Sequence, residues 1–305
     1  MHGNKELEVL LKNGYDPAVA DGIIALEKRL DGHAALAAEL DAVVTAYADR
    51  QEIPMGEALE RVKRISGKYG ENEYSLDLLL VINGLPYMHK RFTENGYPDS
   101  VFYETMDDIR CKVNECVECK GVVGTFVADW YDRFFVPSCF GLGRFQYERA
   151  EYGEDDFTLG CGRVLKKGGT YVNMHIPSRG IPLTDEVRLA SYRAAYPYFK
   201  RYFEDGVVIF GCHSWLLFPK HLQFLPPHLN IRKFIGDFEL VGCEETEKFN
   251  DIWRVFGRYA NLPYEELPRD TALRRAYAEW LCAGNRTGYG FGVFAFDGEK
   301  IVKAP

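Results

Sequence analysis

The residues of this chain that could do chemistry gather in the stretch Tyr171–Phe203. An apolar strand over 171–176, with His175 near its end, leads through a tight loop over 177–182 into a helix. The first N–H groups of a helix have no partner inside the helix, so such a corner is suited to binding an anion. Arg179 in the loop adds a fixed positive charge of the kind that pairs with phosphate. The stretch therefore predicts either a phosphate site or the ordinary strand–turn–helix crossover of an α/β protein.

The helix after this loop has a defined start and a buried face. Thr184 is a good N-cap, because its hydroxyl can accept a hydrogen bond from a free N–H of the first turn. Asp185 and Glu186 follow at the end of the helix where its dipole favours negative charge. Small and apolar residues then recur at helical spacing, at Val187, Ala190, Ser191, Ala194 and Tyr198. This spacing predicts that one side of the helix packs against the rest of its domain.

The composition indicates a globular protein with more than one core. The chain has 305 residues, and single cores stop growing at roughly 250–300 residues. Its net charge of −8 argues against nucleic acid or an anionic membrane as the main partner. Met1–Lys12 carries charges and lacks the apolar core of a signal peptide, and no apolar run approaches the roughly 20 residues of a membrane span. We therefore expect a cytoplasmic protein with reduced cysteines; the oligomeric state does not follow from these features.

Residues 1–135 are predicted to form a helical domain, because apolar residues recur there at helical spacing without sustained strand alternation. One of its helices, Leu76–Ile82, is expected to stop at Asn83-Gly84-Leu85-Pro86. A helical region without a titratable cluster is typical of a scaffold, a lid or a substrate-selecting surface.

Residues 136–305 are dominated by strand patterns. The expected strands are Gly141–Glu151, Phe157–Leu165 with a break at Gly160–Gly162, Thr170–Ile176, Val207–Cys212, Phe238–Cys243 and Gly288–Phe296. Two later helices are expected at Glu247–Tyr259 and Thr271–Ala283. The continuous apolar run Val207–Cys212 is typical of a central strand that is parallel to its neighbour. The order is thus an antiparallel meander, a helical crossover, a parallel strand, and further helices and strands.

This order resembles the GNAT acyltransferase fold, in which the loop and helix N-terminus after the last meander strand hold the diphosphate of an acyl-CoA. The sequence also resembles a bacterial family of two-domain acyltransferases in three stretches, Gly143–Glu148, His175–Thr184 and Ser214–Pro219, with Asn230-Ile231 and Phe234 extending the match. The resemblance implies an α+β protein: an all-helical N-acyltransferase-type domain over 1–135 and a GNAT-like mixed α/β domain with a splayed central sheet over 136–305.

The resemblance also implies roles for individual residues. Acyl-CoA, with an acetyl or longer chain, would be the co-substrate, and its diphosphate would be held by Ser178, Arg179, Gly180, Leu183 and Thr184. The transferred acyl group would go to an amine, and the proton of that amine would pass to His175, Glu148 or His213. A histidine is suited to this step because its side chain titrates near pH 6.5.

Three further residues are candidates for contact with the substrate: Arg144, Trp215 and Asn230. For several candidates a structural role is an alternative, since His175 and His213 could be hydrogen-bonded residues at strand ends and Trp215 could be a core anchor.

The cysteines do not indicate a separate chemistry. Cys212 and His213 are adjacent on a predicted strand, so they point to opposite faces and do not form a nucleophile–base pair. Three cysteines lie close together in the helical part, at Cys111, Cys116 and Cys119. A structural zinc site needs four ligands, so we expect buried thiols and no metal.

The leading prediction is an acyl-CoA-dependent N-acyltransferase that acts by direct transfer on an amine of a small molecule or a peptide. An alternative is a catalytically inactive GNAT-like module that senses a CoA- or nucleotide-like metabolite, because the loop contains only Gly180 where GNAT loops are glycine-rich, and Pro182 removes one N–H donor. A third possibility is a scaffold whose helical half recruits a protein.

Overall fold

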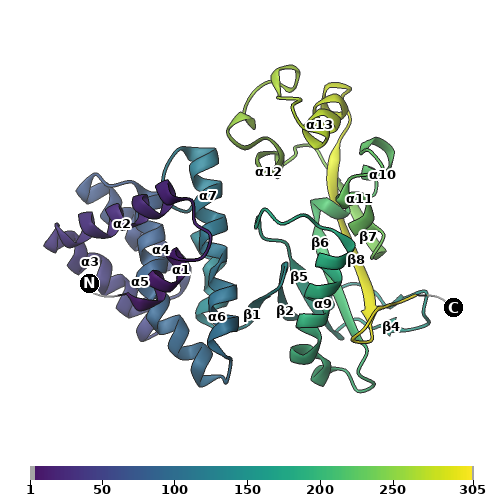
Figure 1. The fold of residues 1–305 in the computed structure, drawn as a ribbon, viewed down its shortest axis with the longest axis horizontal. Coiled ribbons are helices and arrows are strands. Elements are labelled where there is room, and N and C mark those ends of the chain that lie inside the picture. The colour runs from purple at the N-terminus through teal and green to yellow at the C-terminus, as the bar shows by residue number, and fades with distance from the viewer. Residues whose placement is uncertain (1–3, 304–305) are drawn as a thin grey trace. The chain divides into compact units, whose positions relative to one another are not determined.

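The computed structural model describes residues 4–303, and the chain divides into two compact units, Met1–Gly141 and Leu142–Pro305. Figure 1 shows the helices of the first unit in purple to teal and the strands of the second unit in teal, green and yellow. Within 4–303, no helix combines the length and the apolar character that crossing a membrane requires.

The N-terminal unit is built from helices around the long helix α5. Its elements are α1 (Lys5–Leu11), α2 (Pro17–Asp31), α3 (Ala34–Val44), a π-helical turn η1 (Thr45–Asp49), α4 (Met55–Tyr69), α5 (Glu73–Glu94), α6 (Asp99–Met106), α7 (Asp108–Lys120), a 3-10 turn η2 (Ala128–Tyr131) and α8 (Asp132–Phe135). Helix α5 packs against α1 to α4, α6 and α8, and its residues from Leu78 to Ile82 are almost fully buried. The predicted helical character of this half is confirmed.

The prediction that a helix stops at Asn83–Pro86 was wrong, because α5 runs through these residues to Glu94. Pro86 lacks the N–H that would bond to the carbonyl of Ile82. That carbonyl instead accepts a hydrogen bond of 2.8 Å from the side-chain amide of Asn4. Gly84 is needed for packing, since a Cβ atom there would lie 2.5 Å from the ring of Phe135.

The strands of the chain, from Cys139 onward, form one large mixed sheet and one small hairpin. The strands are β1 (Cys139–Leu142), β2 (Phe145–Glu151), β3 (Phe157–Thr158), β4 (Val164–Leu165), β5 (Thr170–His175), β6 (Val208–Ser214), β7 (Glu239–Thr246), β8 (Thr287–Phe296) and β9 (Ile301–Val302). The large sheet has the order β1-β2-β5-β6-β8-β7 with β9 on β8, and β3 and β4 form a separate two-stranded sheet. Strands β5 and β6 are parallel, as predicted, and the pairs β2–β5, β6–β8 and β7–β8 are antiparallel.

The helices of the C-terminal unit are α9 (Asp185–Phe199), η3 (Lys200–Tyr202), η4 (Trp215–Leu217), α10 (His221–Phe224), α11 (Asn230–Ile235), α12 (Ile252–Phe256), η5 (Gly257–Tyr259), η6 (Tyr264–Glu266) and α13 (Ala272–Cys282). Helix α9 crosses one face of the sheet (Figure 1), where Tyr192 packs against Phe145 and Phe210. A second apolar cluster, which includes Tyr152 and Val293, covers strands elsewhere in the sheet.

Two predicted strands were too long. The expected strand Gly141–Glu151 is a hairpin, because Gly143 adopts a φ of 71° and turns the chain between β1 and β2. The expected strand Phe157–Leu165 is reduced to the short hairpin β3–β4, with Gly162 at a φ of 86° in its turn. The later helix expected over Glu247–Tyr259 is also shorter, since α12 begins only at Ile252.

Candidate active site

The parallel strands β5 and β6 separate toward their carboxyl ends. Among the described residues, their ladder consists of the pairs Val172–Phe210 and Asn173–Gly211. Strand β5 nevertheless continues to His175 and β6 to Ser214. Beyond these pairs β5 and β6 pair with their other neighbours and not with each other, as expected for the splayed sheet of a GNAT-like fold, and His175 lies in this part of β5.

His175 is hydrogen-bonded to Glu148 on the neighbouring strand. The His175 Nε2 atom lies 2.7 Å from Glu148 Oε1, and the Asn173 side-chain amide donates to the same oxygen at 3.1 Å. Both side chains of the pair are about one-fifth exposed, at 21% each. An ionised carboxylate can only accept a hydrogen bond, so Nε2 is the donor to Glu148; in the neutral form of the ring the lone pair is then on Nδ1. The structure thus brings two of the three predicted catalytic residues together.

Sequence reasoning missed Gln146, which lies directly opposite His175 in the β2–β5 ladder. Its side chain is 1% exposed, and within 4–303 its Nε2 group has no hydrogen-bond partner. Residues 146 and 148 are two apart on β2, so both side chains lie on the face that carries His175. A buried, unpartnered amide is costly, which makes it a candidate donor to a bound substrate. The only sequence signal for it was the alternation of polar residues at 144, 146 and 148.

Two buried arginines bind backbone carbonyl groups of the loop that follows β5. Arg144 donates to the carbonyl of Pro177 at 2.7 Å and to that of Ile181 at 2.9 Å, and Arg188 donates to the carbonyl of Leu183 at 2.7 Å. In a trans peptide the N–H points opposite to the preceding carbonyl. The carbonyls therefore face the arginines, and the N–H groups of Ser178 and Thr184 point away from them.

The outer side of the loop is open at Gly180. This residue has a φ of 74°, and a Cβ atom placed there would meet nothing within 4 Å. Among the described residues, the backbone N–H groups of Gly180 and Leu183 donate to no carbonyl or side chain. Thr184 caps α9 as predicted, with its hydroxyl accepting from the Val187 N–H at 3.4 Å. These amides form the potential anion site of the corner.

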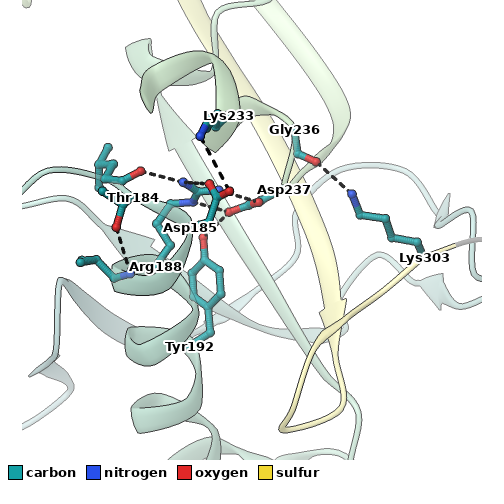
Figure 2. A network of polar contacts seen from close by, with 10 residues as sticks. Thr184, Asp185, Arg188, Tyr192, Lys233, Gly236, Asp237 and Lys303 are labelled. Atoms are coloured by element: carbon teal, nitrogen blue, oxygen red, sulfur yellow. Dashed lines mark hydrogen bonds and ion pairs between the residues drawn. The ribbon is translucent and has the colours of Figure 1, made fainter. Parts of the chain in front are cut away.

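A polar network fixes the start of α9 (Figure 2). The Arg188 guanidinium is bound to both carboxylate oxygens of Asp237, at 2.6 Å and 3.0 Å, and the Tyr192 hydroxyl donates to Asp237 at 2.9 Å. Asp185 lies 3.1 Å from Arg188 and 4.0 Å from Lys233. Because Arg188 also holds the Leu183 carbonyl, this network determines the position of the loop.

Two arginines that were predicted to contact ligands are buried and bind backbone carbonyls. Arg144, expected to contact substrate, is 8% exposed and donates to the carbonyl of Pro177 in the loop after β5. Arg179, expected to face a diphosphate, is also 8% exposed, and its Nη1 donates to the carbonyl of Gly143. Sequence shows that an arginine is present in a loop but not which side of the loop its guanidinium occupies.

The other candidates, His213, Trp215 and Asn230, are found in different surroundings. His213 is 58% exposed, lies 4.0 Å from Glu244 and stacks on Tyr289. Trp215 packs against an apolar cluster that contains Tyr277, which supports the core-anchor alternative over substrate contact. Asn230 is the partly exposed first residue of α11.

Cys212 does not provide a nucleophile. Its side chain is buried, and burial raises the pKa of the thiol to about 12. A thiol with this pKa is almost entirely protonated near neutral pH, so it is a poor nucleophile. Acyl transfer through an acyl-cysteine at this position is therefore not supported by the structure.

Comparison with known proteins agrees with this fold. Residues 5–136 match the model of the N-acyltransferase N-terminal domain, and residues 139–294 match the model of the GNAT-like C-terminal domain. Among curated proteins, none has a sequence significantly similar to this chain.

Solved structures of acyltransferases share the fold over nearly the whole chain. One, in complex with decanoyl-CoA and teicoplanin, has a TM-score of 0.71 and 22% identity, covering 97% of this chain and 88% of its own. A mutant acyltransferase in complex with octanoyl-CoA has a TM-score of 0.70 and 22% identity, covering 96% of this chain and 88% of its own. Another, in complex with decanoyl-CoA, has a TM-score of 0.61 and 20% identity, covering 95% of this chain and 98% of its own. At this level of identity the likeness establishes the fold.

The fold and the matched domains define an enzyme of the acyltransferase class. The chain belongs to the family with a GNAT-like C-terminal domain, preceded here by an N-acyltransferase N-terminal domain.

Proposed function

We propose that this protein transfers an acyl group from acyl-CoA to an amine, without a covalent acyl-enzyme intermediate. The observation that carries the proposal is the His175–Glu148 pair at the point where β5 and β6 separate. Support for acyl-CoA as the donor comes from related folds that bind octanoyl-CoA or decanoyl-CoA. The acceptor is proposed to be a small molecule, since one related structure contains teicoplanin. The cytoplasmic location stays a prediction.

The diphosphate of the CoA would bind at the loop between β5 and α9. The N–H groups of Gly180, Leu183 and Thr184, with that of Ser178, are the proposed donors, and the α9 dipole adds partial positive charge. Arg179 is left out of this set, because its guanidinium is buried against Gly143. The rigid support from Arg144 and Arg188 means that the loop is already ordered before the ligand arrives.

The proton of the amine would pass to Nδ1 of His175. Glu148 holds the ring through Nε2 and stabilises the imidazolium that forms. The neutral amine attacks the thioester carbon, the C–S bond breaks, and the CoA thiolate takes up a proton. The Gln146 amide is the proposed donor to the thioester oxygen, which gains negative charge during the attack. A group that moves one proton in the transition state contributes roughly 10²–10⁴ in rate.

The test is release of free CoA thiol from decanoyl-CoA in the presence of a panel of primary amines. We expect turnover by the wild type and a loss of about 10²-fold or more in His175→Gln. The matched control is His228→Gln, which changes a histidine that lies outside the site. If the wild type releases no thiol with any amine and any acyl chain length, the transferase proposal is wrong.

The second candidate is a sensor that binds CoA or a related nucleotide without turnover. It is favoured by the buried Arg179 and by the single glycine of the loop, which leave fewer cationic and amide donors than a catalytic CoA site usually has. Tight binding of CoA in calorimetry, combined with no thiol release from acyl-CoA, would select this candidate.

A further inference from the structure

Asn173 occupies the place in the large sheet at which β5 and β6 part. It is opposite Glu148 in the β2–β5 ladder and is paired with Gly211 in the β5–β6 ladder. Its neighbours along β5, Val172 and Met174, are the buried apolar residues that a central strand requires. Asparagine is depleted in strands, because its side chain competes with the ladder for backbone hydrogen bonds. A residue that goes against the local preference at such a position is typical of a functional site.

The side-chain amide of Asn173 lies against both members of the His175–Glu148 pair. Its Nδ2 atom donates to Glu148 Oε1 at 3.1 Å and lies 3.3 Å from His175 Nε2. The same Oε1 atom accepts from His175 Nε2 at 2.7 Å. Because Nδ2 and Nε2 are both donors in this arrangement, they do not bond to each other and instead share one carboxylate oxygen. The amide is therefore placed to alter the charge that the imidazole ring experiences.

Within the C-terminal unit, ionisable side chains reach this face of the sheet from β5 itself and from both of its neighbours. On β2, Glu148 supplies the carboxylate that contacts the His175 ring. On β6, His213 is 58% exposed and lies 4.0 Å from Glu244, so solvent screens its charge. On β5, burial and then the charge of Glu148 raise the pKa of Tyr171, which stays neutral near pH 7. The charge that acts most directly on His175 from these strands is that of Glu148.

The contact with Asn173 works against the protonated form of the imidazole. The Glu148 carboxylate by itself favours an imidazolium, since the opposite charges attract and the ring N–H donates to it. The amide N–H on the same oxygen offsets part of that negative charge, and its positive end lies beside Nε2. Both effects favour the neutral ring. A general base has to be neutral before it can take up a proton, and it is most efficient when it titrates near the working pH.

Resting on the transferase function proposed above, we propose that Asn173 is a positioning residue that keeps His175 neutral in the free enzyme. It acts through Glu148: the amide holds the carboxylate oxygen toward the ring and limits the pull of that oxygen on the proton. Glu148 still stabilises the imidazolium that forms when the amine gives up its proton. Asn173 itself contacts neither CoA nor the acceptor in this assignment.

The test is an NMR titration of the His175 ring in the protein without CoA or amine, with its signal assigned by its loss in His175→Gln. The first variant is Asn173→Leu, whose side chain has a similar size and branching but no N–H. We expect the midpoint of the His175 titration to rise by about half a pH unit or more in this variant. Asn173→Asp keeps the shape of the side chain and adds a second carboxylate, so it should raise the midpoint further.

The matched control repeats Asn173→Leu in a Glu148→Gln background, in which the carboxylate that Asn173 acts through is missing. The shift caused by the substitution should be much smaller there. In turnover of decanoyl-CoA, Asn173→Leu should move the acid limb of the kcat/KM profile to higher pH. Its kcat/KM at high pH should stay close to that of the wild type, because His175 is neutral in both proteins. A purely structural role would instead lower kcat/KM at every pH.

The assignment is overturned if the midpoint stays unchanged or falls in Asn173→Leu and Asn173→Asp, or if the shift is equally large without the Glu148 carboxylate. These outcomes are separate from a failure of the transferase function. A raised midpoint without thiol release from decanoyl-CoA by the wild type would refute the transfer step and retain Asn173 as the residue that controls the charge of His175. Thiol release by the wild type together with an unchanged midpoint in both variants would retain the transferase and refute the role of Asn173.

Discussion

The network around Asp237 predicts a large loss of stability when its carboxylate is removed. Arg188 has a side-chain exposure of 4% and is bound to both oxygens of Asp237, which is itself 14% exposed. Asp237→Ala leaves the guanidinium buried without its main counter-charge. Breaking a buried ion pair in this way costs about 3–5 kcal/mol. The carbonyl of Leu183 and the exposed Asp185 remain near Arg188, so we expect a value toward the lower end of that range.

The assay is urea unfolding of the C-terminal unit, with the midpoint and slope compared between variants. For a unit of this size, 3 kcal/mol corresponds to a fall in Tm of roughly 6–12 °C. Asp185→Ala is the matched control, because Asp185 also contacts Arg188 but is 61% exposed, and an exposed pair contributes at most about 1 kcal/mol. Tyr192→Phe removes one hydrogen bond to a charged group, so its cost of about 1.5–3 kcal/mol should not add fully to that of Asp237→Ala. A loss for Asp237→Ala no larger than that of the control would refute the reasoning.

Three further outcomes follow from the same contacts. His175→Gln and Glu148→Gln should each lower kcat. The kcat of the double variant should fall no further than that of the worse single variant, since the two groups act as a unit. Additive losses of kcat in steady-state kinetics would contradict this. Gln146→Met should lower kcat by about 10²-fold, as for the loss of an oxyanion donor. Its stability should be unchanged or higher, because an unpartnered buried amide is removed. An unchanged kcat would show that Gln146 has a structural role only. Burial lowers the pKa of His221 from 6.5 to about 4, so below pH 6.5 the unfolded chain takes up a proton that the native state does not. Stability should therefore fall by about 2 kcal/mol between pH 7 and pH 5, and urea unfolding of His221→Gln should show a smaller fall.

The sequence predicted those parts of the fold that depend on local signals. Thr184 as an N-cap and a parallel strand close to the expected Val207–Cys212 both follow from residue types and spacing within a few positions, although the strand extends two residues further, to Ser214. Helix α5 shows where this fails. The break expected at Pro86 is avoided by Asn4, which is 78 residues away from Ile82 and was not visible as its partner in the sequence.

In the candidate active site, too, features set by the local sequence were predictable and features set by distant residues were not. His175 was predicted near the end of its strand and lies there, whereas Glu148, to which it is hydrogen-bonded, lies in the middle of β2 opposite Asn173. The roles of the arginines were not predictable, because Arg188 is fixed by Asp237, 49 residues later, and Arg144 by the carbonyls of a loop after β5. Whether a guanidinium faces a ligand or the protein is decided by such distant partners.

The central claim is that backbone amides just past β5 bind the diphosphate of CoA. The most direct measurement is calorimetry with CoA and with pantetheine, which lacks the diphosphate, on the wild type and on Gly180→Ala. Gly180 has a φ of 74°, and a Cβ atom added there would have no neighbour within 4 Å, so alanine would strain the loop by about 1–2 kcal/mol without a steric clash. We predict that the wild type binds CoA far more tightly than pantetheine, and that Gly180→Ala weakens CoA about tenfold and leaves pantetheine unchanged. Equal affinities of the wild type for the two ligands, or an equal effect of the substitution on both, would contradict the account.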